Sequence, residues 1–181
     1  MTVYIGNFSE SINLDQLVKE VKQNKGDRRT FQDSYFDTSI NEFNNILTNW
    51  NDAEYDISCI EWFNYYNGVQ FSTEYTKIFS SLVNATPVKV WVSEILPGKC
   101  FPYHWDVDTN TSLYVGNKMV RYQMMVEDCV LGHYFVLDDV TLTGYKKGDV
   151  YKWNDYKEWH GGGNISFVNK YIYNFLGISN D

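Results

Sequence analysis

The stretch Val88-Lys89-Val90-Trp91-Val92 decides the fold, because its valines alternate with other residues at a period of two. Alternation of β-branched and aromatic residues predicts a strand with one buried face. Further strands are predicted over 120–126, 134–137, 150–153 and 171–176. Turns are predicted between them at Pro97-Gly98, Gly116-Asn117, Asp138-Asp139, Lys147-Gly148 and Gly161-Gly162-Gly163. This many short strands at such spacing indicates a sandwich or jelly roll.

Upstream of Pro87 the apolar residues recur every three or four positions, which indicates helices. Helices are predicted from Leu14 to Val21, over 41–50 and over 72–84. We expect them to cover an apolar face of the sheet from outside. The expected organisation is one domain over 1–181, with a mostly helical flank (1–87) and a β core (88–176).

The composition excludes several classes of protein. With 181 residues, 44% hydrophobic and 18% aromatic, the chain is suited to one well-filled core. A net charge of −8 opposes binding to nucleic-acid backbones. The N-terminus lacks a signal-peptide pattern, and no apolar run reaches membrane-spanning length, so we expect a cytoplasmic protein without a membrane partner. The three cysteines have no C-x-x-C spacing, which argues against a disulfide framework or a thiolate zinc site.

The candidate metal ligands are His104, Asp106 and His160. Side chains at i and i+2 of a strand point to the same side, so His104 and Asp106 can reach one ion. Two imidazoles and one carboxylate suit non-haem Fe(II) with open coordination positions. The alternative is a solvated histidine at a strand end beside an ordinary loop aspartate.

The order of these motifs resembles the aspartyl/asparaginyl β-hydroxylase-like family of Fe(II)- and 2-oxoglutarate-dependent oxygenases. In the stretch 92–98 a strand runs into a Pro-Gly turn, and His104 follows six residues later. Arg121 falls where the family has an arginine on the next strand. The stretch 148–153 resembles the strand before the distal histidine, and 160–166 matches the region of that histidine. The resemblance covers roughly 88–176.

This resemblance implies a fold, ligands and a cosubstrate. The fold would be mainly β with flanking helices: a double-stranded β-helix, which is a cupin-like jelly roll. Fe(II) would be bound by His104, Asp106 and His160. Lys170, ten residues after His160, would neutralise the far carboxylate of 2-oxoglutarate, where the family usually has arginine. The other residues implied to contact this cosubstrate are Arg121, Ser93 and Gln123, the last at a position where the family often has histidine.

The implied activity is hydroxylation of an amino-acid side chain, either free or within a peptide or protein. A catalytically silent cupin-like module that binds a metal or small acid is the alternative, favoured by Lys170 and Gln123. A zinc hydrolase using the same ligands would need a general base, such as Glu127 or Glu158. His133 is either a fourth ligand, a substrate contact or an ordinary strand residue. The aromatic residues that either line the pocket or belong to the core are Tyr103, Trp105, Tyr122 and Trp153.

Overall fold

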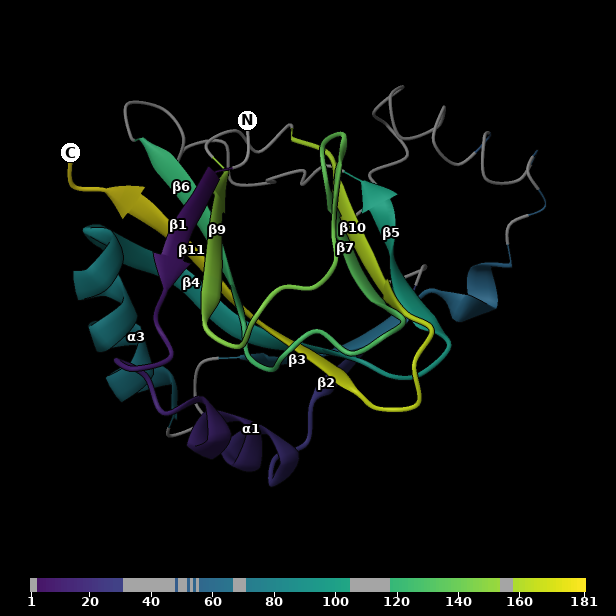
Figure 1. The fold of residues 1–181 in the computed structure, drawn as a ribbon, viewed down its shortest axis with the longest axis horizontal. Coiled ribbons are helices and arrows are strands. Elements are labelled where there is room, and N and C mark those ends of the chain that lie inside the picture. Colours follow the sequence, from purple (N-terminus) through teal and green to yellow (C-terminus); the bar gives the residue numbers. More distant parts are fainter. Residues whose placement is uncertain are drawn as a thin grey trace.

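Two antiparallel sheets face each other in the computed structural model, which describes residues 3–30, 48, 52, 54, 56–66, 71–104, 118–153 and 158–181 (Figure 1). The major sheet has the order β1 (Val3–Asn7), β9 (Asp149–Trp153), β6 (Met119–Met125), β11 (Lys170–Ser179), β4 (Ala85–Ile95), β3 (Glu61–Tyr66) and β2 (Asp27–Thr30). The minor sheet has the order β5 (Lys99–His104), β10 (His160–Asn164), β7 (His133–Leu137) and β8 (Val140–Leu142). The predicted jelly roll is therefore confirmed, as are the five strands predicted from alternation.

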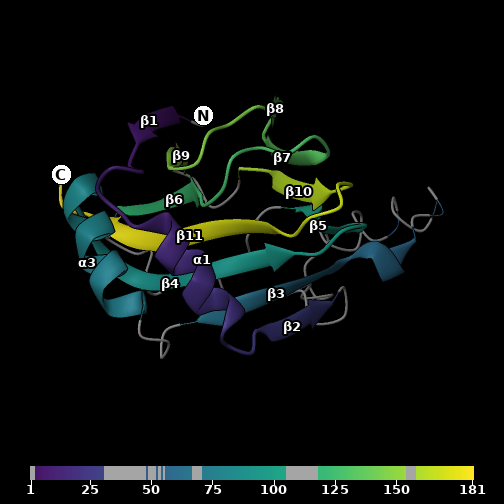
Figure 2. The same ribbon diagram turned by 60° about the horizontal axis from the view of Figure 1, so that its bottom comes forward.

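Helices cover the outer face of the major sheet, as predicted. Helix α1 (Leu14–Lys22) and helix α3 (Phe71–Val83) lie against this face in Figure 2. Asn13 caps α1, because its Oδ1 accepts a hydrogen bond from the Gln16 backbone N–H at 3.1 Å. The outer core joins both helices to the sheet, and its central residues are Leu17, Val21, Phe79, Tyr173 and Phe175. Among the described helices, none is long and apolar enough to cross a membrane.

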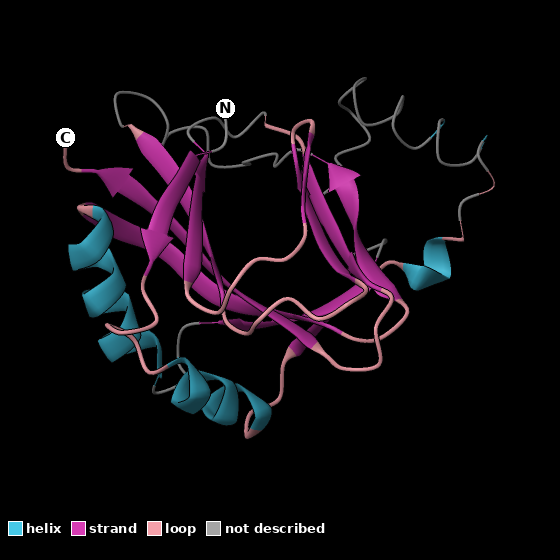
Figure 3. Ribbon diagram, viewed as in Figure 1, coloured by secondary structure: helices cyan, strands magenta, loops and turns pink. Residues whose placement is uncertain are grey.

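The described residues among the first 87 include strands as well as the two helices α1 and α3. They supply β1, β2 and β3 to the major sheet, and β4 starts at Ala85, before Pro87 (Figure 3). Strands β1 and β2 lie at the two edges of the sheet. Each is therefore defined by pairing with the strand beside it and not by alternation in its own sequence. Pro87 lacks an N–H and is tolerated beside a register shift at Leu176/Gly177. The helix predicted over 41–50 and the turn at Gly116-Asn117 lie essentially outside the described residues.

The triple glycine forms a strand instead of the predicted turn. Strand β10 lies between β5 and β7, and Gly161, Gly162 and Gly163 all lie within it. A Cβ on Gly161 would lie 3.0 Å from Tyr103 Cα, and one on Gly163 would lie 2.5 Å from Tyr134 Cζ. Side chains cannot be accommodated here, so the glycines allow close packing within a sheet rather than a change of direction.

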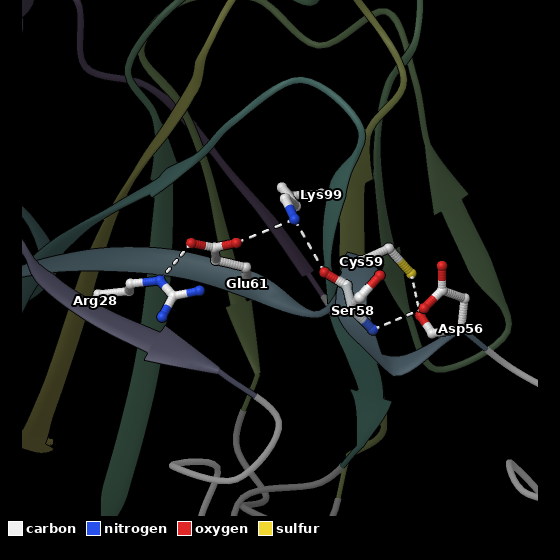
Figure 4. Close-up of polar contacts among 6 residues, drawn as sticks. All are labelled: Arg28, Asp56, Ser58, Cys59, Glu61 and Lys99. Atoms are coloured by element: carbon white, nitrogen blue, oxygen red, sulfur yellow. Dashed lines mark hydrogen bonds and ion pairs between the residues drawn. The ribbon is translucent and has the colours of Figure 1, made fainter.

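A polar corner connects the two sheets beside β5. Glu61 of β3 accepts hydrogen bonds from Arg28 of β2 at 2.5 Å and from Lys99 of β5 at 3.0 Å (Figure 4). Lys99 Nζ also donates to the Ser58 carbonyl, in the short 3-10 helix η2 (Ile57–Cys59), at 2.9 Å. Hydrogen bonding from Arg28 and Lys99 lowers the pKa of Glu61. Beneath this corner the rings of Trp62 and Phe101 pack 4.8 Å apart, so β5 is fixed against the major sheet.

Candidate metal and cosubstrate site

His104 and His160 lie side by side in the minor sheet. They are direct partners in the pairing of β5 with β10. Their ring centroids are 4.5 Å apart, with 49° between the ring planes. Two imidazoles bound to one ion through nitrogens at about 2.1 Å would have centroids roughly 4–5 Å apart. The pair therefore fits two ligands of one metal ion.

Backbone carbonyls fix the orientation of both imidazoles. His104 Nδ1 donates to the Pro102 carbonyl at 2.7 Å, and His160 Nδ1 donates to the Glu158 carbonyl at 3.0 Å. A carbonyl can only accept, so Nδ1 carries the proton in each ring. In the neutral imidazole this makes Nε2 the nitrogen with the lone pair, which is the arrangement of second-shell bonds typical of metal-binding histidines.

The predicted third ligand, Asp106, lies outside the described residues. Within the described part of the chain, no group of three or more His, Cys, Asp or Glu side chains is suitably arranged for a metal ion. The structure thus brings together two of the three predicted ligands, and the role of Asp106 stays a prediction.

Lys170 is buried between the two sheets. Its side chain extends from β11 in the major sheet and donates a hydrogen bond to the Tyr134 carbonyl in the minor sheet. The ammonium nitrogen lies 5.6 Å from the Phe135 ring centroid and 5.9 Å from that of Tyr145. Burial in these apolar surroundings lowers the pKa of Lys170 to about 7.

Gly162 indicates where the Lys170 amine lies relative to the histidine pair. A Cβ on Gly162 would lie 3.4 Å from Lys170 Nζ, so this glycine faces the interior beside the amine. His160 is two residues away on the same strand and faces the same side. Two residues of strand span about 6.6 Å. The amine therefore lies one strand repeat deeper in the roll than the imidazoles.

Ser93 and Gln123 belong to a hydrogen-bonded ladder across the inner face of the major sheet. Gln123 Nε2 donates to Asn174 Oδ1 at 2.9 Å, and Asn174 Nδ2 donates to Ser93 Oγ at 3.0 Å. The Ser93 hydroxyl donates to Asn64 Oδ1 at 2.8 Å and accepts from Trp91 Nε1 at 3.1 Å. The Ser93 hydroxyl thus uses its donor and both acceptor positions within the ladder.

Arg121 and Trp153 are register partners on β6 and β9. The Trp153 ring is buried, and its centroid lies 5.4 Å from that of His160. Among the described residues, neither Trp153 Nε1 nor Gln123 Oε1 has a hydrogen-bond partner. A buried polar group left without a partner costs about 1–3 kcal/mol. These two atoms therefore mark positions where a bound molecule or water would be stabilised, and the sequence alone did not single out Trp153 from other aromatics.

Of the remaining candidates, His133 and Tyr122 lie away from the histidine pair, whereas Tyr103 directly precedes His104 on β5. His133 is buried at the other end of β10, where it pairs with Asn164 and contacts Ser166 Oγ at 2.9 Å. Burial lowers its pKa. Tyr122 packs in the outer core against Phe79. Tyr103 is largely exposed and stacks on Trp159 with centroids 5.2 Å apart. The aromatic Trp105 lies outside the described residues.

Comparison with known proteins identifies similar folds only. No protein-family model matches the sequence, and no curated protein does either. AviO1 from Streptomyces viridochromogenes Tue57 has a TM-score of 0.56 at 11% identity, covering 99% of this chain and 90% of that chain. The collagen prolyl hydroxylase of Paramecium Bursaria Chlorella virus-1, in its 2OG complex, has a TM-score of 0.51 at 12% identity, covering 98% and 96%. A Pseudomonas putida prolyl-4-hydroxylase has a TM-score of 0.51 at 9% identity, covering 93% and 100%.

Proposed function

We propose that this protein is an Fe(II)- and 2-oxoglutarate-dependent dioxygenase that hydroxylates an amino-acid side chain, free or within a peptide or protein. The observation that carries the proposal is the histidine pair with the buried amine of Lys170 one strand repeat deeper. That spacing suits a small dicarboxylate with one end at the metal and the other at the amine. The jelly roll is shared with two prolyl hydroxylases and is compatible with this function. At sequence identities of 12% and 9%, these two proteins support the fold alone.

His104, Asp106 and His160 would hold the iron, whose chemistry when bound with 2-oxoglutarate and dioxygen is oxidation of a C–H bond. The carbonyls of Pro102 and Glu158 keep both imidazoles in one tautomer and orientation. This pre-organisation reduces the cost of assembling the ligand set.

Lys170 would bind the far carboxylate of 2-oxoglutarate as a point charge. The amine would take up a proton when the dianion binds, because its pKa of about 7 rises beside a carboxylate. Lysine offers no bidentate fork, so the Tyr134 carbonyl and the apolar walls would fix its direction.

Four residues would form the inner wall around the cosubstrate. Arg121 would pair with an anionic group near the metal, and the Trp153 indole N–H would donate to an oxygen of the bound molecule. Ser93 and Gln123 would line the cosubstrate, held in place by Asn174. The apolar inner cluster around Ile172 and Phe135 would keep water from the reacting atoms.

The test is succinate formation from labelled 2-oxoglutarate with Fe(II) and ascorbate. We expect the wild-type protein to form succinate, slowly without substrate, and His160→Ala to form none. Lys170→Met should retain iron and raise the apparent KM for 2-oxoglutarate at least tenfold. The exposed Lys77→Met on α3 is the matched control and should behave as wild type.

Two results would contradict this function. If iron and 2-oxoglutarate bind but no succinate forms under any condition, the protein is a silent binding module. If protein purified anaerobically contains stoichiometric zinc and does not bind 2-oxoglutarate, the hydrolase alternative replaces the dioxygenase.

A further inference from the structure

Two neighbouring loops display apolar side chains at the end of the sheets away from the histidine pair. Phe167 is 100% exposed, Leu131 is 97% exposed and Ile165 is 76% exposed. We call these three residues, together with Val130 and Val168, the apolar tip. They belong to the β6–β7 loop and to the β10–β11 loop, which is the yellow loop at the lower right of Figure 1.

Internal hydrogen bonds hold the apolar tip in place. The Ile165 N–H donates to the Gly132 carbonyl at 2.9 Å, which joins the two loops. Asn164 Nδ2 donates to the carbonyls of Ile95 at 2.8 Å and Val168 at 2.7 Å. Gly132 has φ of +100°, and a Cβ there would lie 2.8 Å from the Ser166 nitrogen. The loops are therefore fixed with their apolar side chains outward, although a contiguous exposed apolar patch is unusual without a partner.

A groove continues from the apolar tip. It has a volume of about 490 Å³, and Val130 and Val168 form its apolar side. The groove is also lined by Asn169 and Tyr171, which both donate to Glu94 Oε1, at 2.7 Å and 2.5 Å. Tyr171 and Glu94 are buried and Asn169 is half-buried, and their hydrogen bonds make the groove a formed surface feature. The other residues that line the groove are Lys22, Glu127 and Asp128.

The groove carries an unbalanced negative charge. Lys22 lies over the Tyr171 ring, with its Nζ 5.2 Å from the centroid, whereas Glu127 and Asp128 supply two carboxylates. Lys147, the other cation that acts on Glu127, is paired with Asp15 at 2.6 Å. Asp128 accepts a hydrogen bond from the Lys147 backbone N–H at 2.9 Å. Glu127 is half-buried, and this partial burial raises its pKa, so an incoming cation would stabilise its charged form.

We propose that the apolar tip and the groove together bind a segment of a partner protein that carries a lysine or arginine next to apolar side chains. The basic side chain would pair with Glu127 in the groove, and the apolar side chains would cover Phe167 and Leu131. The net charge of −8 favours a basic partner and opposes both a second copy of this acidic chain and an anionic lipid surface. This site is separate from the proposed dioxygenase centre.

The experiment selects from a displayed random library of peptides on the immobilised full-length protein. We expect the enriched peptides to combine a basic residue with adjacent Leu, Ile or Phe. The affinity of one synthesised peptide is then measured by fluorescence anisotropy. Phe167→Ser and Glu127→Gln should each raise its Kd at least tenfold, whereas the exposed Leu82→Ser on α3 should leave the Kd unchanged.

Each other outcome would overturn the proposal. The proposed docking site would be contradicted if the enriched peptides lacked basic residues. It would also be contradicted if neither Phe167→Ser nor Glu127→Gln changed the Kd of the peptide. Dimerisation in sedimentation velocity that Phe167→Ser abolishes would assign the surface to a second copy. Co-sedimentation with phosphatidylcholine vesicles that Phe167→Ser abolishes, without peptide binding, would assign it to lipid. Because no assay requires iron or 2-oxoglutarate, failure here is distinct from failure of the proposed dioxygenase function.

Discussion

At the scale of single residues, Lys170 is the most unusual group in the described chain. A lysine that is 1% exposed among aromatic rings would be costly as a cation, and burial lowers its pKa to about 7. An arginine in this position would stay charged at any physiological pH. The lysine therefore makes both ligand binding and stability depend on pH in a way that arginine would not.

The affinity for 2-oxoglutarate should fall as pH rises above 7. Binding of the dianion favours the protonated amine, which becomes about tenfold rarer per pH unit above its pKa in the unliganded protein. We expect Kd to rise by up to about tenfold per unit between pH 7.5 and 9, measured by calorimetry with Mn(II). Lys170→Arg should show a flat profile. A similar slope in the arginine variant would assign the effect to another group.

The stability of the unliganded protein should rise with pH relative to Lys170→Met. The unfolded lysine has a pKa near 10.4, so between about pH 7 and 10 the unfolded state binds more protons than the folded state. The unfolding free energy of the wild type minus that of Lys170→Met should increase by up to about 1.4 kcal/mol per pH unit in this window. Below pH 7 this difference should become independent of pH. Urea denaturation at several pH values measures it. A difference independent of pH would mean that the amine is charged in the fold.

At the scale of elements, strand β10 depends on glycine at three successive positions. His160 lies beside His104 because the two are register partners in the pairing of β5 with β10, where the glycines leave room for the Tyr103 backbone and the Tyr134 ring. The spacing of the two imidazoles is thus a property of the strand, not only of the histidines.

Gly163→Ala should destabilise the protein by about 1–3 kcal/mol, because the new methyl group would overlap the Tyr134 ring. Thermal and urea unfolding measure the change. The double variant Gly163→Ala/Tyr134→Leu should recover part of the loss, since the leucine leaves room for the methyl group. Strict additivity of the two changes would show that the overlap is not the cause.

At the scale of the whole molecule, the proposed site lies between the two sheets. The histidine pair belongs to the minor sheet, whereas Lys170 and Trp153 belong to the major sheet. A ligand that contacts both sheets would stabilise the folded state, because unfolding separates the two sheets and breaks those contacts.

Metal and 2-oxoglutarate together should raise the thermal unfolding midpoint. At a ligand concentration of 100 times Kd the stabilisation is about 2.7 kcal/mol, equivalent to roughly 5–10 °C for a chain of this size. Mn(II) avoids oxidation during the scan, and EDTA should reverse the shift. His160→Ala should show no shift and Leu82→Ser the full shift. An unchanged midpoint in the wild type at saturating ligand would argue against binding between the sheets.

Local sequence was sufficient to predict the strands whose alternation is strong, such as Val88 to Val92, and the two amphipathic helices around Leu17 and Phe79. Alternation reports which side of a strand is buried, so these elements can be predicted locally. The resemblance also suggested His104 and His160 as ligands of one ion, but in the sequence they are only two separate positions.

The folded chain was needed to show that these imidazoles are adjacent, that the glycines form a strand and that β1 to β3 join the major sheet. Each of these depends on hydrogen bonds and packing between residues far apart in sequence, which local periodicity does not report. The same applies to the burial that lowers the pKa of Lys170 and to the exposure of Phe167, since both are set by what the fold brings next to a side chain and what it leaves uncovered.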